Sequence, residues 1–449
     1  MLVLLVMLTA CTRAETQVPD GAVVTERPLA TREPTLAGEI ETEVLDPFEI
    51  ADLAITGLDG NILLADVDSG QVVQLTDDAQ PDPSAGGQVI VYGEPTWSPS
   101  SDQIAFLRSM RSSGEALDVD ILVAGRDGDW DEIDSGSERP FYMYWAPTGD
   151  SLSFLASRPG ETISLWIKNL DNQGFRVDQG QPYYWDWAPD GQRLFAHVGG
   201  STDFNPDAAY LSFFDRSQNQ DLLDLPPLSF QAPAYSPDGT RILVSSRPKL
   251  GSDVLLMLGV EGEVIQEVMS VEGRASFGWS KTGTHFALSI GPDLGGAHVG
   301  ILSLFQLNDE GRAELERKIA EDVIAFWWSP DGRKIAYFVP VLSPTDLSQP
   351  ISTNVQEDNE LFLELYVYDV EDDVSRRLSS FRPTAEFLRI MPYYDQYQRS
   401  ATIWSADSQL ISYASMGTGS VGEIFVINAA DNDGPRRIAT GEIAYWSRR

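Results

Sequence analysis

Residues 328–337 read WSPDGRKIAY, and the same pattern recurs along most of the chain. Close copies are YSPDGTRILV at residues 235–244 and WAPDGQRLFA at residues 187–196. Weaker copies begin at Trp97, Trp145, Trp279 and Trp404. The copies follow one another at intervals of 42 to 49 residues, apart from one longer interval after Trp328. A repeat of this length, made of short strands and turns, is typical of a β-propeller.

The centre of the pattern is a turn whose residues each have a conformational reason. Pro330 presets φ for the second turn position, Asp331 can accept hydrogen bonds from its own backbone, and Gly332 tolerates the positive φ that follows. The strand before the turn is therefore expected to pair with the strand after it as a hairpin. The aromatic residue that opens each copy removes roughly 150–250 Å² from water when it is buried, enough to fill the space between two packed sheets.

Each copy is followed by two further strand signals, such as residues 365–369 and 376–378 after Trp328, and four strands make one blade. Residues 444–447 read as an inner strand without a partner after it. Three early signals, at 52–56, 62–67 and 72–76, read as the missing strands of that blade. We therefore predict an all-β fold, a β-propeller of eight four-stranded blades closed by strands from both termini. Seven blades is the alternative, if one irregular unit is an embellishment.

The first residues predict a targeting signal. Residues 1–10 are apolar apart from Thr9 and are too short to span a bilayer. Residues 8–11, LTAC, resemble the bacterial lipoprotein box, in which signal peptidase cuts before the cysteine and the thiol carries a lipid. Cys11 is the only cysteine of the chain. The alternative is an ordinary secretory signal with an incidental cysteine.

The remaining boundaries follow from composition and from the repeat. Residues 11–47 are rich in Thr, Glu, Pro and Ala, which predicts a disordered tether. Residues 48–449 are expected to form the single propeller, with insertions near 340–360 and 381–399. These insertions account for the longer interval of the repeat.

The chain is strongly acidic, with 68 acidic and 31 basic residues and a net charge of −37. Nucleic acid and anionic lipid head groups are therefore poor partners, and the membrane is expected to be reached through the lipid anchor only. The Asp-rich turns at 66–70 and 431–434 are either solvated turns or Ca²⁺ sites. Neither matches the twelve-residue calcium loop with its closing glutamate.

The repeat resembles that of TolB-type propellers, and the same repeats form the propeller of prolyl-oligopeptidase-type enzymes. The first predicted blade also closes with Gln-Leu-Thr at 74–76, as units of that family often do. The resemblance covers roughly residues 50–449 and implies the propeller fold. Neither the N-terminal α/β domain of TolB nor the hydrolase domain of the peptidases is expected in this sequence. A propeller hosts many activities, so the resemblance implies little about function.

The sequence gives little sign of catalysis. It contains three histidines, His197, His285 and His298, and nothing in the pattern brings them together. Residues 417–422, GTGSVG, match the nucleophile motif G-x-S-x-G poorly and fall between two strand signals. We predict a protein that is not an enzyme, with no catalytic residue, no metal site and no required cofactor.

Three groups of residues are candidates for contact with a ligand or partner. Aromatic residues on the inner strands either line the central channel or pack between blades: Tyr142, Tyr144, Trp185 and Phe326. Arginines at similar blade positions either hold carboxylates or phosphates or form surface ion pairs: Arg108, Arg158 and Arg247. The second insertion is expected to pack as a cap and to offer a contact surface through Tyr393, Tyr394 and Tyr397.

These observations favour a monomeric, lipid-anchored protein of the bacterial cell envelope that binds another envelope protein or a peptide. The alternative is a propeller that binds, and in one version hydrolyses, a glycan or peptide in its central channel. A deep channel lined by Tyr142, Trp185 and Phe326 would favour the alternative, and a channel filled by side chains would favour a scaffold.

Overall fold

The computed structural model describes residues 52–449 except 83–86, 113, 115, 127–129, 200–208, 229–230, 249–250, 293–297, 343–360, 418–419 and 431–432. The predicted signal at 1–10, Cys11, the tether at 11–47 and most of the insertion near 340–360 lie outside the described residues. Contacts assign all described residues to one compact unit, Leu45–Arg449.

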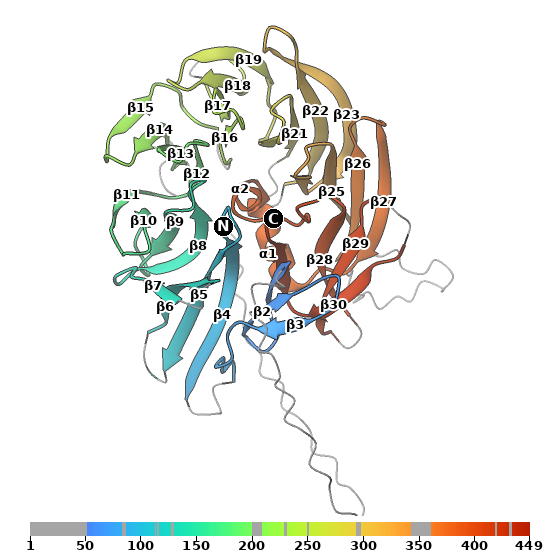
Figure 1. The fold of residues 1–449 in the computed structure, drawn as a ribbon. Helices are drawn as coiled ribbons and strands as arrows, with labels where there is room; N and C mark the ends of the chain where they lie inside the picture. Colours follow the sequence, from blue (N-terminus) through green and yellow to red (C-terminus); the bar gives the residue numbers. More distant parts are fainter. Residues whose placement is uncertain are drawn as a thin grey trace, which may run out of the picture. The chain divides into compact units, whose positions relative to one another are not determined.

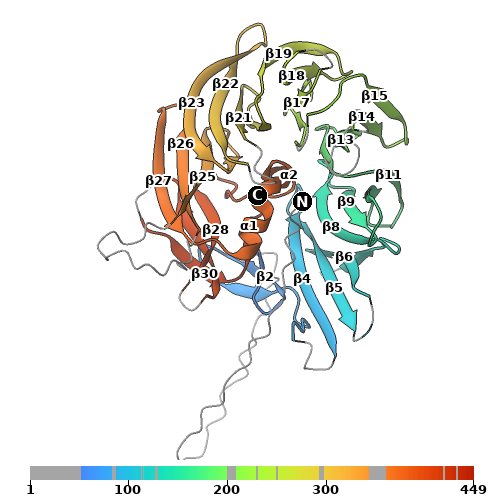
Figure 2. The same cartoon turned by 180° about the vertical axis from the view of Figure 1, so that it is seen from behind.

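The described residues form eight sheets arranged around a ring (Figures 1 and 2), and each sheet is called a blade. Blade 1 consists of β31 (Ile443–Trp446), β1 (Leu53–Thr56), β2 (Ile62–Ala65) and β3 (Val72–Gln74). Blade 2 consists of β4 (Gln88–Trp97), β5 (Gln103–Ser112), β6 (Asp118–Gly125) and β7 (Trp130–Ile133). Blade 3 consists of β8 (Arg139–Trp145), β9 (Leu152–Ser157), β10 (Ile163–Lys168) and β11 (Gly174–Gly180). Blade 4 consists of β12 (Tyr183–Trp187), β13 (Arg193–Val198), β14 (Tyr210–Asp215) and β15 (Gln220–Leu223).

The other half of the ring repeats the arrangement. Blade 5 consists of β16 (Ala234–Tyr235), β17 (Arg241–Ser246), β18 (Val254–Gly259) and β19 (Val264–Ser270). Blade 6 consists of β20 (Arg274–Trp279), β21 (His285–Gly291), β22 (Gly300–Leu307) and β23 (Ala313–Val323). Blade 7 consists of β24 (Ala325–Trp328), β25 (Lys334–Leu342), β26 (Leu361–Asp369) and β27 (Val374–Phe381). Blade 8 consists of β28 (Leu410–Met416), β29 (Gly422–Asn428) and β30 (Arg436–Thr440).

The predicted eight-bladed propeller is confirmed, and the seven-bladed alternative is wrong. Seven blades have four strands, while a single bridge between Trp404 and Ile411 takes the innermost position of blade 8. The predicted closure is also confirmed. Strand β31 pairs antiparallel with β1, with Trp446 opposite Leu53, so strands from both ends of the described chain complete one sheet.

The repeated turn has the chemistry that the sequence predicts. The Oγ of Ser329 donates to Oδ1 of Asp331 (2.6 Å) and accepts the backbone N–H of Lys334 (2.9 Å). The same Oδ1 accepts the N–H of Arg333 (3.0 Å), and Gly332 has a φ of 71°. Side-chain bonds thus fix a hairpin that needs glycine at one position.

The tryptophans of the repeat do more than fill space between blades. The indole N–H of Trp145 donates to the carbonyl of Thr96 (3.1 Å), which directly precedes the aromatic residue Trp97 of the previous blade. Four other joints show the same bond: Trp97 to Tyr445, Trp279 to Ala234, Trp328 to Gly278 and Trp404 to Trp327. Each such bond is worth about 0.5–1.5 kcal/mol, so these indole bonds add to the apolar packing between blades.

The predicted insertion near 381–399 contains the helices of the described chain: α1 (Ala385–Ile390), the 3₁₀ helix η3 (Met391–Tyr393) and α2 (Tyr394–Ser400). Thr384 caps α1 by accepting the N–H of Phe387 (3.2 Å). Both views place α1 and α2 at the centre of the ring (Figures 1 and 2). Among the residues that the structure describes, no helix is long and apolar enough to cross a bilayer.

Candidate functional site

The centre of the ring is occupied by residues 383–402, here called the central insertion. Its Gln396 side chain accepts the backbone N–H of Trp185 and donates to the carbonyl of the same residue, both at 3.0 Å. The Oη of Tyr142 donates to the backbone carbonyl of Gln396 (3.0 Å). Gln396 therefore satisfies both main-chain groups of an inner-strand residue that would otherwise face the channel.

The central insertion contacts every blade on or near its inner strand. Besides Tyr142 of blade 3 and Trp185 of blade 4, its contacts are with Trp446, Thr96, Ala232, Arg274, Phe326 and Ser415. In the order just given, these residues lie in or beside blades 1, 2, 5, 6, 7 and 8. The largest buried apolar cluster likewise joins the central insertion with residues of six blades. One segment of the chain thus fills the middle of the propeller.

Of the four predicted aromatic residues of the inner strands, Tyr142 and Phe326 contact this insertion through their side chains. Trp185 and Phe326 are fully buried, and Tyr142 is 5% exposed. Tyr144 is partly buried, and its Oη donates to Asp186 (3.1 Å). Tyr142 packs edge-to-face against Trp185 and Tyr397, at centroid distances of 5.5 and 5.0 Å. The indole of Trp185 instead donates to Oγ of Ser153 in blade 3 (3.1 Å), so this ring packs between blades, as the alternative predicted.

The three predicted tyrosines of the insertion separate into two environments. Tyr394 and Tyr397 are buried, whereas Tyr393 is 46% exposed. The expectation of an exposed surface formed by all three is corrected, because the insertion enters the ring and turns two of them inward. Partner contact remains a prediction for Tyr393.

Buried charges hold the central insertion in place. Arg274 lies 3.7 Å from Asp395, and both side chains are almost completely buried. Asp395 also accepts the backbone N–H of Ala232 (2.8 Å). Desolvation offsets much of the attraction in such a pair, but removing one partner leaves the other charge buried and uncompensated.

Two further charge contacts surround the same helices. Asp186 of β12 lies 3.9 Å from Arg399 and accepts the N–H of Tyr235 (2.8 Å). Burial raises the pKa of the Asp186 carboxyl, while Arg399 opposes that shift. Glu94 pairs with Arg389 of α1, and burial likewise raises the pKa of Glu94.

Sequence reasoning missed these charges, although one signal was present. Asp186 stands inside the otherwise aromatic strand YYWDW at 183–187, and a carboxylate there requires a buried partner. Nothing in the sequence indicated that the partner would be Arg399 of the insertion.

The predicted arginines do not form a ring. Among the described contacts, none joins two of them, and each pairs with acids of its own blade. Arg108 lies 2.7 Å from Asp120 and 3.1 Å from Glu132. Arg158 pairs with Glu161 at 3.8 Å, and Arg247 with Asp253 at 3.0 Å. The structure therefore shows the ion-pair alternative, and a ligand-binding role for these arginines has no support in their geometry.

The histidines occupy separate environments. His197 is buried, and its Nδ1 lies 3.1 Å from the carbonyl of Gln231. His285 lies 3.4 Å from Glu316, and His298 lies 2.9 Å from Ser289. Within the described ranges, no group of three or more His, Cys, Asp or Glu side chains is placed to hold a metal ion. In the turn at 66–70, the Asp66 carboxylate accepts the backbone N–H of Ser69 (2.7 Å), so this side chain is bonded within its own turn.

His197 gives a pH-dependent prediction. Burial lowers its pKa to about 4, from about 6.5 in the unfolded chain. Between those values the unfolded state binds a proton that the folded state does not. The stabilisation is therefore complete above about pH 6.5 and is lost as pH falls toward 4. As pH falls over this range, the free energy of unfolding of the wild type should decrease by on the order of 3 kcal/mol more than that of His197→Gln. Urea unfolding of both proteins at the two pH limits measures this change. A difference in free energy of unfolding between the two proteins that is the same at both pH values would contradict the prediction.

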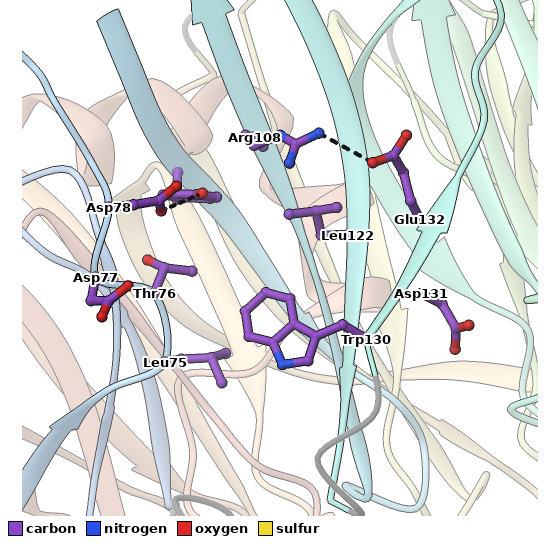
Figure 3. A pocket seen from close by; sticks show the side chains of 10 residues that line it. Leu75, Thr76, Asp77, Asp78, Arg108, Leu122, Trp130, Asp131 and Glu132 are labelled. Carbon is purple, nitrogen blue, oxygen red and sulfur yellow. Dashed lines mark hydrogen bonds and ion pairs between the residues drawn. The ribbon is translucent and has the colours of Figure 1, made fainter.

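A pocket of about 420 Å³ lies between blades 1 and 2. One wall is the segment Leu75–Asp78, which follows β3 (Figure 3). The other wall consists of blade 2 side chains, among them Arg108, Leu122 and Trp130. Thus Arg108 is the one residue of the predicted set that borders this pocket.

Comparison with known proteins adds information on the fold. No protein-family model matches the chain, and no curated protein matches it either. Among solved structures, the Dos1 propeller is 9% identical, with a TM-score of 0.50 over 82% of this chain and 86% of that one. The likeness is one of fold alone.

Two other solved structures illustrate how varied such neighbours are. TolB from Acinetobacter baumannii is 14% identical, with a TM-score of 0.36 over 70% of this chain and 74% of that one. An oligogalacturonate lyase in complex with manganese is 12% identical, with a TM-score of 0.48 over 82% and 95%. A propeller fold hosts many different activities, so the fold decides neither for nor against catalysis.

Proposed function

We propose that this protein is a non-catalytic scaffold of the bacterial cell envelope, anchored by a lipid on Cys11, that binds another envelope protein or a peptide. The observation that carries the proposal is the filled centre of the ring. The side chains that a channel ligand would contact are Tyr142, Trp185 and Phe326. Tyr142 and Phe326 are already packed against the central insertion, and the indole of Trp185 is buried against Ser153 of blade 3 while its main chain is bonded to Gln396.

The remaining surfaces favour recognition of a partner by outer strands and loops. Large apolar side chains are exposed on the outer strands of several blades, including Leu222, Leu315 and Val374 at 60%, 60% and 55%. The net charge of −37 favours a partner with basic surfaces over an acidic one. A glycan- or peptide-cleaving activity in the channel has weaker support, because the histidines are dispersed and the aromatic residues are covered.

Photo-crosslinking in intact bacteria tests the proposal. A crosslinking amino acid replaces Leu222, Leu315, Val374 or Tyr393, one at a time, in otherwise wild-type protein. We expect a discrete adduct with a second protein from at least one position, found in the membrane fraction. In a Cys11→Ser background the protein should leave that fraction and the adduct should weaken. Unirradiated cells are the control.

Two outcomes would contradict the proposal. The absence of adducts at all four positions, together with cleavage of a glycan or peptide by the purified protein, would make it an enzyme. A Cys11→Ser protein that stays in the membrane fraction in mature form would refute the lipid anchor.

A further inference from the structure

The pocket between blades 1 and 2 has an aromatic platform at its centre. Trp130 stands on the outer strand β7 and is 48% exposed. Its ring packs edge-on against the buried Phe106, with centroids 5.6 Å apart and planes at 85°. Phe106 in turn contacts Tyr92 at 5.9 Å. The indole is therefore supported from one side, and Figure 3 shows it projecting between Leu75 and Leu122.

Carboxylates surround this platform. Asp77 and Asp78 come from the segment after β3, and Glu132 lies two residues beyond Trp130, on the same side of β7. Asp78 accepts a hydrogen bond from Tyr92 (2.7 Å). In the part of the chain that the structure describes, the Asp77 carboxylate has no hydrogen-bond partner. The pocket thus offers negative charge on two walls of an exposed aromatic ring.

Arg108, the one basic side chain among the described residues that line the pocket, does not reverse this negative character. Arg108 binds Asp120 and Glu132, so two carboxylates already engage its guanidinium group. A phosphate or carboxylate ligand would compete with them in an acidic surrounding. Of the two alternatives for Arg108, the ion pairs are observed, and they disfavour an anionic ligand in this pocket.

The geometry also separates organic cations from metal ions. Calcium and similar ions need several oxygen ligands within about 2.3–2.6 Å of one point. No set of three or more acidic or histidine side chains among the described residues meets that need. Dispersed carboxylates around an indole face suit instead a cation with an apolar stem, through charge and cation–π attraction. A volume of about 420 Å³ is of the right size for such a group.

We propose that this pocket binds the side chain of a lysine or arginine presented by a protein partner. The partner's identity as a protein rests on the proposed function. The chemistry of the pocket stands on its own, because Trp130, Asp77 and Glu132 would bind the same cationic group in a free amino-acid derivative.

Fluorine NMR of protein labelled with fluorotryptophan tests this proposal. The chain has 11 tryptophans, so the Trp130 resonance is assigned by its loss in Trp130→Phe. The probes are the N-acetyl N-methylamides of lysine, arginine and norleucine. We expect the Trp130 resonance to shift saturably with at least one of the two cations and not with neutral norleucine. The dissociation constants of the lysine and arginine derivatives then show which cation the pocket prefers.

Charge-removing variants make the test specific. Asp77→Asn with Glu132→Gln should weaken cation binding roughly 2- to 30-fold, as expected for the loss of two exposed charge contacts. The matched control, Glu310→Gln with Glu371→Gln, removes the same net charge from exposed turns elsewhere and should leave binding unchanged.

Three results would overturn the proposal: no shift of the Trp130 resonance with either cation, equal shifts with norleucine, or equal weakening by the control pair. A different result would contradict the proposed function alone. In that case the cations still bind at Trp130, while crosslinking in cells yields no protein adduct.

Discussion

Removing residues 441–449 should lower the free energy of unfolding by more than about 5 kcal/mol, because it deletes the strand that closes the ring. All four residues of β31 are buried, including Tyr445 and Trp446. Their loss exposes the inner edge of β1, and the carbonyl of Tyr445 is no longer available to the indole of Trp97. Thermal and urea unfolding followed by circular dichroism measure the effect.

The matched control removes Arg448 and Arg449 alone. This deletion loses the two hydrogen bonds that Arg448 donates, from its side chain to the carbonyl of Arg399 and from its backbone N–H to Oγ of Ser101, but keeps every residue of β31. We expect a clearly smaller loss of stability. Equal losses in the two truncated proteins would mean that pairing of β31 with β1 contributes little to holding the ring together.

The second large effect concerns the buried pair of Arg274 and Asp395. Arg274→Met leaves the Asp395 carboxylate buried without its cation, and such a change costs about 3–5 kcal/mol. Asp395→Asn keeps an oxygen for the N–H of Ala232 and removes the charge. The double variant should therefore be more stable than Arg274→Met alone, a strongly non-additive result in a double-mutant cycle.

Urea unfolding of the wild type, the two single variants and the double variant gives the coupling energy. Tryptophan fluorescence during the same titrations reports whether the centre of the ring opens before the blades do. Additive effects of the two substitutions would show that Arg274 and Asp395 do not depend on each other, and the central insertion would then be held by its apolar contacts.

The blades were predictable because their information is local. The turn at Ser329–Gly332 needs only neighbouring residues to form, and the aromatic residue that opens each copy fixes where an inner strand ends. Closure by β31 followed from counting strands. For a segment such as 340–360, in contrast, length and polarity predict no particular conformation.

The candidate site was less predictable, because it depends on contacts between distant segments. The position of Tyr142 and Trp185 on inner strands left open whether they line the channel or pack between blades, and it did not indicate that an insertion would meet Tyr142. The insertion carries too few residues per helix for a periodic pattern to show which side is buried. Likewise, the sequence showed acids near Arg108 without showing that Asp120 and Glu132 would both bind it.

The indole bonds between blades have a consequence for how the repeat can vary. Their acceptors are main-chain carbonyls, and the residues that supply them are as different as Thr96, Gly278 and Trp327. At these five joints the bond therefore requires a particular side chain only at the donor and sets no requirement on the side chain of the acceptor residue. The inner-strand backbone thus serves as a common acceptor around much of the ring, while the apolar side chains at each joint differ from one joint to the next.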